Sequence, residues 1–185
     1  MSLRSLPRPA RDGIWIALVT SASILFSLAL ACATPFAAIA TIAGTKMNRR
    51  EAGILVGIAW LVNQTVGYLI LGYPQTWDSF AWGGIIVVAA LLAVLATSTT
   101  EQLSGPSAVS LVICFLAAFV VYELTLFAAT VFLPSSARAF SVAVVARIFA
   151  INATALVGLI LLHRAAVDLG VLAAAGHVAP SGTRV

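Results

Sequence analysis

The sequence predicts an all-α integral membrane protein, a polytopic bundle of six transmembrane helices with both termini in the cytoplasm. Of its 185 residues, 62% are hydrophobic and only 9% are charged, whereas a soluble domain carries about 25% charged residues. Apolar runs recur along the chain with about the 20 residues that a helix needs to cross a bilayer, and basic residues cluster between them. This composition argues against a water-soluble enzyme, a disordered chain and a nucleic-acid-binding module.

The first expected helix covers residues 14–32 and is preceded by Arg4, Arg8 and Arg11. The segment 31–33, Ala-Cys-Ala, also has the small-x-small form of a signal-peptide cleavage site. However, the run is longer than the apolar region of about 7–15 residues in a signal peptide, and a second apolar stretch follows it. We therefore expect a retained helix, with cleavage as the alternative.

The second expected element, residues 35–45, is apolar but short, about 15–18 Å as a helix at 1.5 Å per residue. Three structures suit it: a short spanning helix, a re-entrant segment, or a bent continuation of the first helix. Pro35 disfavours helix at Thr34 and marks a break there.

Basic residues favour the spanning alternative. One cluster precedes residues 14–45, and Lys46, Arg49 and Arg50 follow them. Both clusters belong in the cytoplasm by the positive-inside rule, so an even number of crossings separates them. The alternative, five helices plus a re-entrant segment, places one basic cluster on the outside.

Four further apolar runs complete the predicted bundle and alternate in direction across the membrane: 51–72, 80–97, 108–133 and 139–162. The segment from Thr97 to Ser107, with its Gly-Pro turn signal, is expected to be a cytoplasmic loop. The connections are short, so we expect a cytoplasmic tail at 1–12, one transmembrane domain at 13–164 and a second cytoplasmic tail at 165–185.

An acid and a base stand inside the predicted membrane segments. If the last two runs form an antiparallel hairpin centred near residue 135, Glu123 and Arg147 lie at one depth, about 18 Å below the outer loop and near the bilayer midplane. A lone charge there costs about 2.5–3.5 kcal/mol or more, which favours pairing. The pair is interpreted either as a structural ion pair that locks the two helices together or as a group that anchors a substrate or handles protons.

Asn63 and Gln64 are predicted at the same level, which completes a polar layer with Glu123 and Arg147. Asn152 is expected about one and a half turns deeper. We interpret it as an interhelical hydrogen-bonding residue, because it stands apart from the others.

The outer ends of the helices carry Tyr73, Trp77, Asp78, Trp82 and Arg138. An aromatic belt at the membrane interface explains the tryptophans, and a helix N-cap explains Asp78. The competing interpretation is a lid over an outward-facing pocket whose floor is the polar layer. On that interpretation Tyr73, Trp77 and Asp78 are substrate-binding candidates.

The cysteine and histidine residues provide few candidates for a metal-binding or catalytic site. Cys114 is expected to be a small buried residue, and Cys32 at the pocket mouth is a weak candidate for a soft metal ligand. No HExxH, GxSxG, P-loop or pair of transmembrane histidines occurs. We therefore expect no catalytic residue and no cofactor, and a protein that is not an enzyme.

A chain of this length, with six helices, cytoplasmic ends, a short second helix and a pocket closed by outer loops, resembles the substrate-binding (S) components of energy-coupling factor vitamin transporters. The spacing of Ala29, Ala33 and Ala37 is similar to the small-residue face on which those proteins dock their transmembrane coupling partner. No substrate-specific motif is present, so no site residue is transferred.

The resemblance implies capture of a small vitamin-like or metal-containing solute from the outer side of a bacterial inner (cytoplasmic) membrane. A coupling protein with an ATPase then drives uptake by toppling the binding protein. The expected partners are the lipid bilayer, the solute and this coupling protein, with no nucleic acid. The alternative function is a non-enzymatic accessory subunit of a larger membrane complex, in which the polar pair is only a lock.

Overall fold

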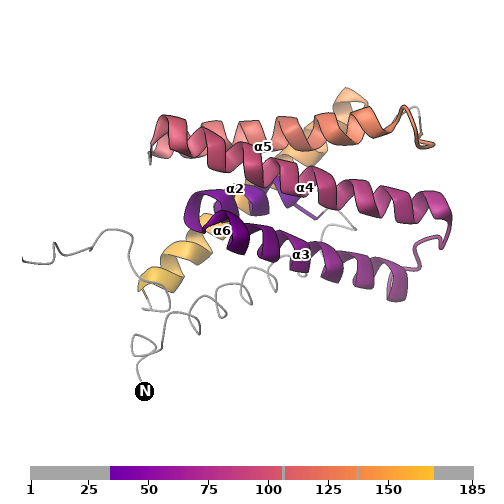
Figure 1. The fold of residues 1–185 in the computed structure, drawn as a ribbon, viewed down its shortest axis with the longest axis horizontal. Coiled ribbons are helices and arrows are strands. Elements are labelled where there is room, and N and C mark those ends of the chain that lie inside the picture. The colour runs from indigo at the N-terminus through magenta and orange to yellow at the C-terminus, as the bar shows by residue number, and fades with distance from the viewer. Residues whose placement is uncertain (1–33, 106, 137, 169–185) are drawn as a thin grey trace, which may run out of the picture.

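The computed structural model describes residues 34–105, 107–136 and 138–168, and in this part all regular secondary structure is α-helix (Figure 1). Four helices are long and apolar enough to cross a membrane, α3, α4, α5 and α6, and α2 is shorter. The predicted first helix at 14–32, Cys32, Ala29, Ala33 and the tail beyond residue 168 lie outside the described residues. The helices are α2 (Phe36–Lys46), α3 (Arg49–Leu69), α4 (Trp77–Ser104), α5 (Ala108–Ala129) and α6 (Val142–Asp168).

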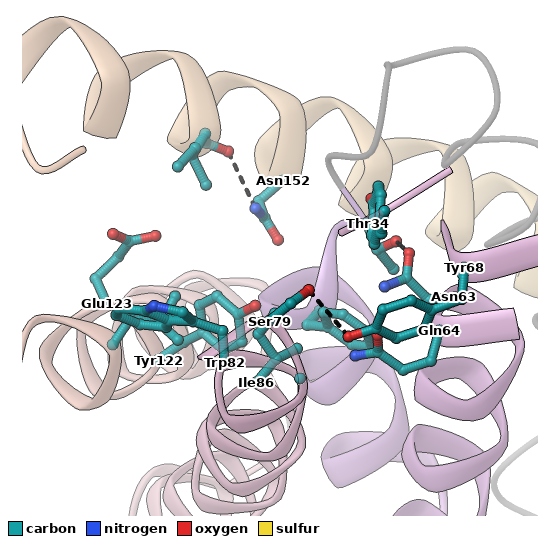
Figure 2. A pocket seen from close by; sticks show the side chains of 15 residues that line it. Thr34, Asn63, Gln64, Tyr68, Ser79, Trp82, Ile86, Tyr122, Glu123 and Asn152 are labelled. Atoms are coloured by element: carbon teal, nitrogen blue, oxygen red, sulfur yellow. Dashed lines mark hydrogen bonds between the residues drawn. The ribbon is translucent and has the colours of Figure 1, made fainter. Parts of the chain in front are cut away.

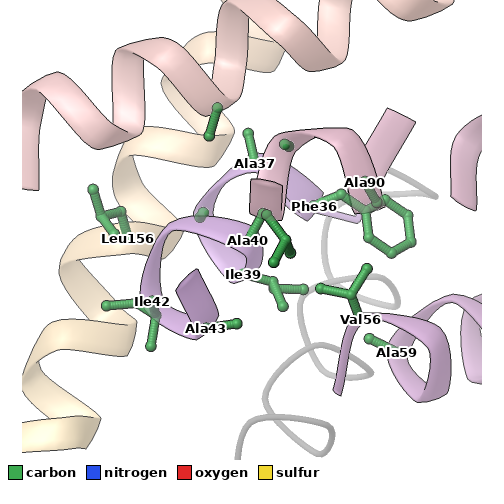
Figure 3. Close-up of a cluster of buried hydrophobic side chains, with 14 of the residues drawn as sticks. Phe36, Ala37, Ile39, Ala40, Ile42, Ala43, Val56, Ala59, Ala90 and Leu156 are labelled. Atoms are coloured by element: carbon green, nitrogen blue, oxygen red, sulfur yellow. The ribbon is translucent and has the colours of Figure 1, made fainter. Parts of the chain in front are cut away.

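Helix α2 lies at the centre of the bundle and packs against all four long helices (Figures 1 and 3). Every residue from Phe36 to Gly44 is buried. Ile39 and Ile42 fill the space between Val56 of α3 and Leu156 of α6 (Figure 3). Its 11 residues span about 17 Å, less than the ~30 Å hydrocarbon core, so α2 alone is too short for a full crossing.

Close packing of α2 on α4 depends on Gly44. A β-carbon at this position would lie 2.9 Å from Cβ of Thr97 and 3.2 Å from the carbonyl oxygen of Val94. Because these atoms belong to the backbone and to the root of a side chain, they cannot rotate away. Glycine therefore sets the distance between α2 and α4.

Helix α3 begins two residues earlier than the apolar run predicts, because its N-terminus is capped. The Asn48 side chain accepts a hydrogen bond from the Glu51 amide at 3.0 Å, and the Glu51 carboxylate accepts from the Asn48 amide at 3.4 Å. This capping box satisfies two amides that a helix start leaves unpaired. Arg49 and Arg50 therefore lie in the first turn of α3.

Helix α4 is longer than predicted, and the expected loop from Thr97 to Ser107 is wrong for most of its length. The helix continues to Ser104 and ends at Gly105, whose φ of 71° lies in the left-handed region. Hydroxyl side chains in this polar segment bond to the carbonyl four residues back, so they are satisfied inside a helix. They are Thr97, Ser98, Thr99, Thr100 and Ser104.

The last two helices do not form the tight antiparallel hairpin that the sequence predicts. Helix α5 packs closely against α4, whereas α6 packs on α2 and slants across the bundle (Figure 1). The connection between α5 and α6 covers residues 130–141, long enough to let α6 diverge from α5. Equal distance along the two helices therefore does not bring their side chains together.

The connections lie at two opposite ends of the bundle (Figure 1). We call the end with the α3–α4 and α5–α6 connections the Pro74 end, and the end with the α2–α3 and α4–α5 connections the Gly105 end.

Candidate solute-binding cavity

A cavity of about 380 Å³ lies between the four long helices near the Pro74 end, beside the start of α2 (Figure 2). This volume is within the range of about 300–1,000 Å³ for small-molecule sites. The lining combines polar side chains with a majority of apolar and aromatic ones: Thr34, Phe36, Asn63, Gln64, Tyr68, Tyr73, Ser79, Trp82, Gly83, Ile86, Tyr122, Glu123, Leu126, Ile148 and Asn152.

Three of the four residues of the predicted polar layer line this cavity: Asn63, Gln64 and Glu123. Their depth differs from the prediction. Asn63 is six residues before the end of α3, and Glu123 is six residues before the end of α5, which places both about 9 Å from the helix ends. The layer therefore lies about two turns below the Pro74 end and not at the middle of the helices.

The amide side chains of α3 are held by neighbouring elements. The Thr34 hydroxyl donates a hydrogen bond to Oδ1 of Asn63, which ties the segment before α2 to α3. Gln64 packs over Gly83 of α4, where a β-carbon would lie 2.9 Å from its Nε2. The Trp60 indole donates to the Gly83 carbonyl at 2.8 Å. Gly83 therefore allows α3 and α4 to approach, and it makes room for Gln64 at the cavity wall.

Glu123 is the one ionisable acid or base in the lining, tyrosine hydroxyls aside, among the residues that the structure describes. Its Oε1 atom is buried and has no hydrogen-bond partner in the described part of the chain. Figure 2 shows its carboxylate on the side of the cavity opposite Asn63 and Thr34. A buried carboxylate oxygen without a partner is costly, so this group is available to a ligand that carries a hydrogen-bond donor or a positive charge.

The predicted ion pair between Glu123 and Arg147 is wrong. Arg147 is exposed, does not line the cavity and makes no ion pair with Glu123. It stands five residues after the first residue of α6, about 8 Å from the helix start. A long side chain this close to a helix end reaches the membrane interface without a buried partner.

Asn152 joins the cavity lining, but its hydrogen bonds explain its presence without a ligand. Its Oδ1 accepts from the Ala38 amide in the first turn of α2 at 3.1 Å, and its Nδ2 donates to the Ile148 carbonyl at 3.0 Å. The α2 helix has no side-chain cap of its own, since Pro35 occupies the N-cap position. Asn152 thus supplies the missing cap from α6, in agreement with its interpretation as an interhelical residue.

Aromatic side chains form much of the wall. The Tyr68 hydroxyl lies 3.1 Å from Oγ of Ser79, and its ring meets Tyr73 edge to face with centroids 5.8 Å apart. Tyr122 is buried and packs against Phe36 at the start of α2. Such rings hold flat or positively charged organic groups.

The predicted rim residues divide between the cavity and its surroundings. Tyr73 lines the cavity, whereas Asp78 lines an adjoining hollow of about 480 Å³ that shares Ser79 and Trp82 with it. Trp77 is 68% exposed and lines neither space, which suits a membrane-interface residue. Asp78 does not cap α4, because the N-cap position belongs to Thr76 and Asp78 lies in the first turn.

The α5–α6 connection is tied to the rim by Trp82, whose indole donates to the Pro134 carbonyl at 3.0 Å. Pro134 also lines the adjoining hollow. Trp82 thus links the cavity wall on α4 to the connection above it.

Several lining residues were missed by sequence reasoning, among them Tyr68, Ser79 and Tyr122. A signal for Tyr68 existed, since it follows Gln64 by four residues and shares its helical face. Thr34 was expected at the outer rim, in the turn before the short second element, whereas Phe36 carried no sequence signal. Both reach the cavity because α2 starts inside the bundle.

Neither metal-ligand geometry nor a known relative identifies the site. Within the described residues no three His, Cys, Asp or Glu side chains gather in a group that could hold a metal ion. No protein-family model, curated protein or solved structure matches this chain. Its function is therefore argued from the cavity.

Proposed function

We propose that this protein binds a small vitamin-like solute from the outer side of the membrane for uptake, in a bundle of six transmembrane helices with both termini in the cytoplasm. The observation that carries the proposal is the cavity of about 380 Å³ with a carboxylate, three side-chain amides and several aromatic rings in its wall. A site for a small organic molecule has this composition, mostly apolar with a few convergent polar groups.

The distribution of basic residues supports an outward-facing cavity. Lys46, Arg49 and Arg50 lie at the Gly105 end, and Arg164 lines a hollow beside Lys46 there. Towards the Pro74 end the described basic residues are Arg138 and Arg147. The positive-inside rule assigns the richer end to the cytoplasm, which directs the cavity outwards.

The chemistry of the lining limits the class of solute that the cavity can bind. Glu123 offers a carboxylate, and no Lys, Arg or His side chain stands in the described lining to neutralise it. Aromatic rings accept a flat group, and their faces attract a positive charge. The proposed solute is therefore small and at least partly flat, with a cationic or hydrogen-bond-donating group next to Glu123 and polar atoms that reach Asn63 or Gln64.

Transport of such a solute needs an energy source. In keeping with the resemblance to S components, we assign this role to a transmembrane coupling protein with an ATPase. The solute-binding step is independent of that partner and is tested first.

The test is a thermal-shift screen of the purified full-length protein against vitamins and related cations, followed by titration calorimetry of each hit. Glu123→Gln is expected to weaken binding roughly tenfold or more, because a charge-assisted hydrogen bond is lost, while the unliganded protein keeps its thermal stability. Asp168→Asn is the matched control, since it removes an exposed acid at the end of α6, outside the cavity lining.

Two results would contradict the proposal. One is a ligand whose affinity is the same in wild type, Glu123→Gln and Gln64→Ala, because such a ligand does not occupy the cavity. The other is the absence of any ligand together with co-purification of a stoichiometric membrane partner, which favours the accessory-subunit alternative.

A further inference from the structure

A second hollow, of about 330 Å³, lies at the Gly105 end of the bundle. It is formed by the C-terminal ends of α2 and α4, the N-terminus of α5 and the last turns of α6. None of its lining residues lines the solute cavity. It is therefore a separate site.

Two cations border this hollow, Lys46 from the last turn of α2 and Arg164 from α6. Both side chains are exposed, and neither makes an ion pair with a described residue. Glu101 and His163 also line it. The positive groups come from two helices far apart in the sequence, so the fold and not local spacing brings them together.

The N-terminus of α5 opens onto the same hollow through Ser107 and Ala108. The Ser107 hydroxyl caps the helix by accepting from the Ser110 amide at 3.0 Å. The amides of the first turn before Ser110 have no partner within the helix. Together with the helix dipole they make a favourable position for an anion.

The hydroxyl of Ser110 provides an independent sign of a missing ligand. The side chain is only 3% exposed and lines the hollow, yet its Oγ has no nitrogen or oxygen partner among the described residues. Its one recorded side-chain partner there is the Cys114 thiol, a weak hydrogen-bonding group that leaves the hydroxyl without a strong acceptor. Buried hydroxyl groups are almost always paired, so an acceptor oxygen of a bound molecule is expected here.

We propose that this hollow binds a phosphodiester group, with the phosphate held by Lys46, Arg164, the first turn of α5 and the Ser110 hydroxyl. Amides at a helix start, a hydroxyl and two cations are the groups that recognise phosphate oxygens. The Glu101 carboxylate stands in the same lining and opposes a second negative charge. It favours a phosphodiester that carries an ammonium group, as in an ethanolamine phosphate.

Two sources supply this chemistry, a phospholipid headgroup and a soluble phosphodiester. Exposed apolar side chains lie close in sequence to lining residues on α4 and α5, among them Leu103 at 85%, Val109 at 69% and Val112 at 56% exposed. They offer a surface for acyl chains, so the phospholipid is the source that we test first.

Native mass spectrometry of the full-length protein in detergent, with added phosphatidylethanolamine, tests the site. The wild type is expected to retain one lipid, and Lys46→Gln/Arg164→Gln is expected to weaken retention about tenfold or more through lost charge-assisted contacts. The matched control is Arg49→Gln/Arg50→Gln. It removes the same charge from the same end of the bundle, but neither residue lines the hollow.

Ser110→Ala separates binding from folding. Because it removes a buried hydroxyl whose one recorded side-chain partner is the weakly bonding Cys114 thiol, it is expected to leave the lipid-free protein about as thermally stable as wild type while it weakens lipid retention several-fold. Glu101→Gln is expected to abolish the preference for phosphatidylethanolamine over phosphatidylglycerol. A parallel experiment uses glycerophosphoethanolamine, which is a soluble phosphodiester. If it binds, and the same substitutions weaken its binding, the natural ligand of this site is a soluble molecule.

Three outcomes would overturn the proposal. Equal retention by wild type and Lys46→Gln/Arg164→Gln is the first. Equal loss in Arg49→Gln/Arg50→Gln is the second, since it indicates diffuse attraction to basic residues. Unchanged retention of both the lipid and the soluble ester in Ser110→Ala is the third.

Discussion

Substitution of Gly67 by alanine is expected to displace Tyr73 from the wall of the solute cavity. Gly67 lies in α3, and a β-carbon there would lie 2.3 Å from Cε2 and 2.5 Å from Cδ2 of the Tyr73 ring. Ordinary carbon–carbon contacts need about 3.5–4.0 Å, so the ring has to move by about 1.2 Å or more. The Tyr73 amide also donates to the Gly67 carbonyl at 3.0 Å, which limits how far the chain can retreat.

The net effect of Gly67→Ala on stability combines two opposing contributions. Overpacking of this kind costs about 1–3 kcal/mol, whereas glycine to alanine inside a helix contributes about 0.5–1 kcal/mol of stability. We therefore expect a net loss of about 1–2 kcal/mol in the free energy of unfolding, measured by SDS titration in mixed micelles.

A double-mutant cycle tests the cause. In a Tyr73→Ala background the clash is absent, so adding Gly67→Ala is expected to raise stability by about 0.5–1 kcal/mol. Gly57→Ala is the control, because it lies in the same helix and its β-carbon would meet no atom within 4 Å. It is expected to stabilise the protein by a similar amount.

Equal destabilisation by Gly67→Ala with and without the Tyr73 ring would show that a clash with this ring is not the cause. The same effect of Gly67→Ala and Gly57→Ala in the otherwise wild-type chain would also contradict the clash.

Three further predictions follow from the packing of α2 and the position of Arg147. Asn152→Ala is expected to lower the free energy of unfolding by about 1–3 kcal/mol, because a buried amide of α2 loses its acceptor; Asn152→Asp keeps an acceptor and is expected to lose less, and an equal loss in both would contradict the capping role. Gly44→Ala is expected to cost about 1–3 kcal/mol in the same assay through its contact with α4, whereas Gly53→Ala, whose β-carbon would meet its nearest atom only at 3.9 Å, is expected to stabilise the protein by about 0.5–1 kcal/mol; equal effects would argue against a tight α2–α4 contact. The changes in stability caused by Arg147→Gln and Glu123→Gln are expected to add in the double variant, within about 0.5 kcal/mol. A larger coupling energy would be evidence for an ion pair between the two side chains.

Part of the cavity lining was predictable, because relative depth along a straight helix follows from residue counting. Asn63, Gln64 and Glu123 were expected at one level from their distances to the connecting loops, and they do line one cavity. Residue counting misplaced Arg147, because it assumes that α6 runs antiparallel beside α5. Sequence periodicity contains no information on the angle between two helices that are joined by a long connection.

By itself, the sequence determined the helical character of the chain, the approximate positions of the four long helices and three of the polar side chains that line the cavity, Asn63, Gln64 and Glu123. Hydropathy and helix length control these properties, and both are local. Only the tertiary structure decided that α2 lies buried at the centre, that Asn152 caps it from α6 and that Glu123 has no cationic partner within residues 34–105, 107–136 and 138–168. These features depend on how the helices cross and how closely Gly44 and Gly83 let them approach, which are contacts between segments far apart along the chain.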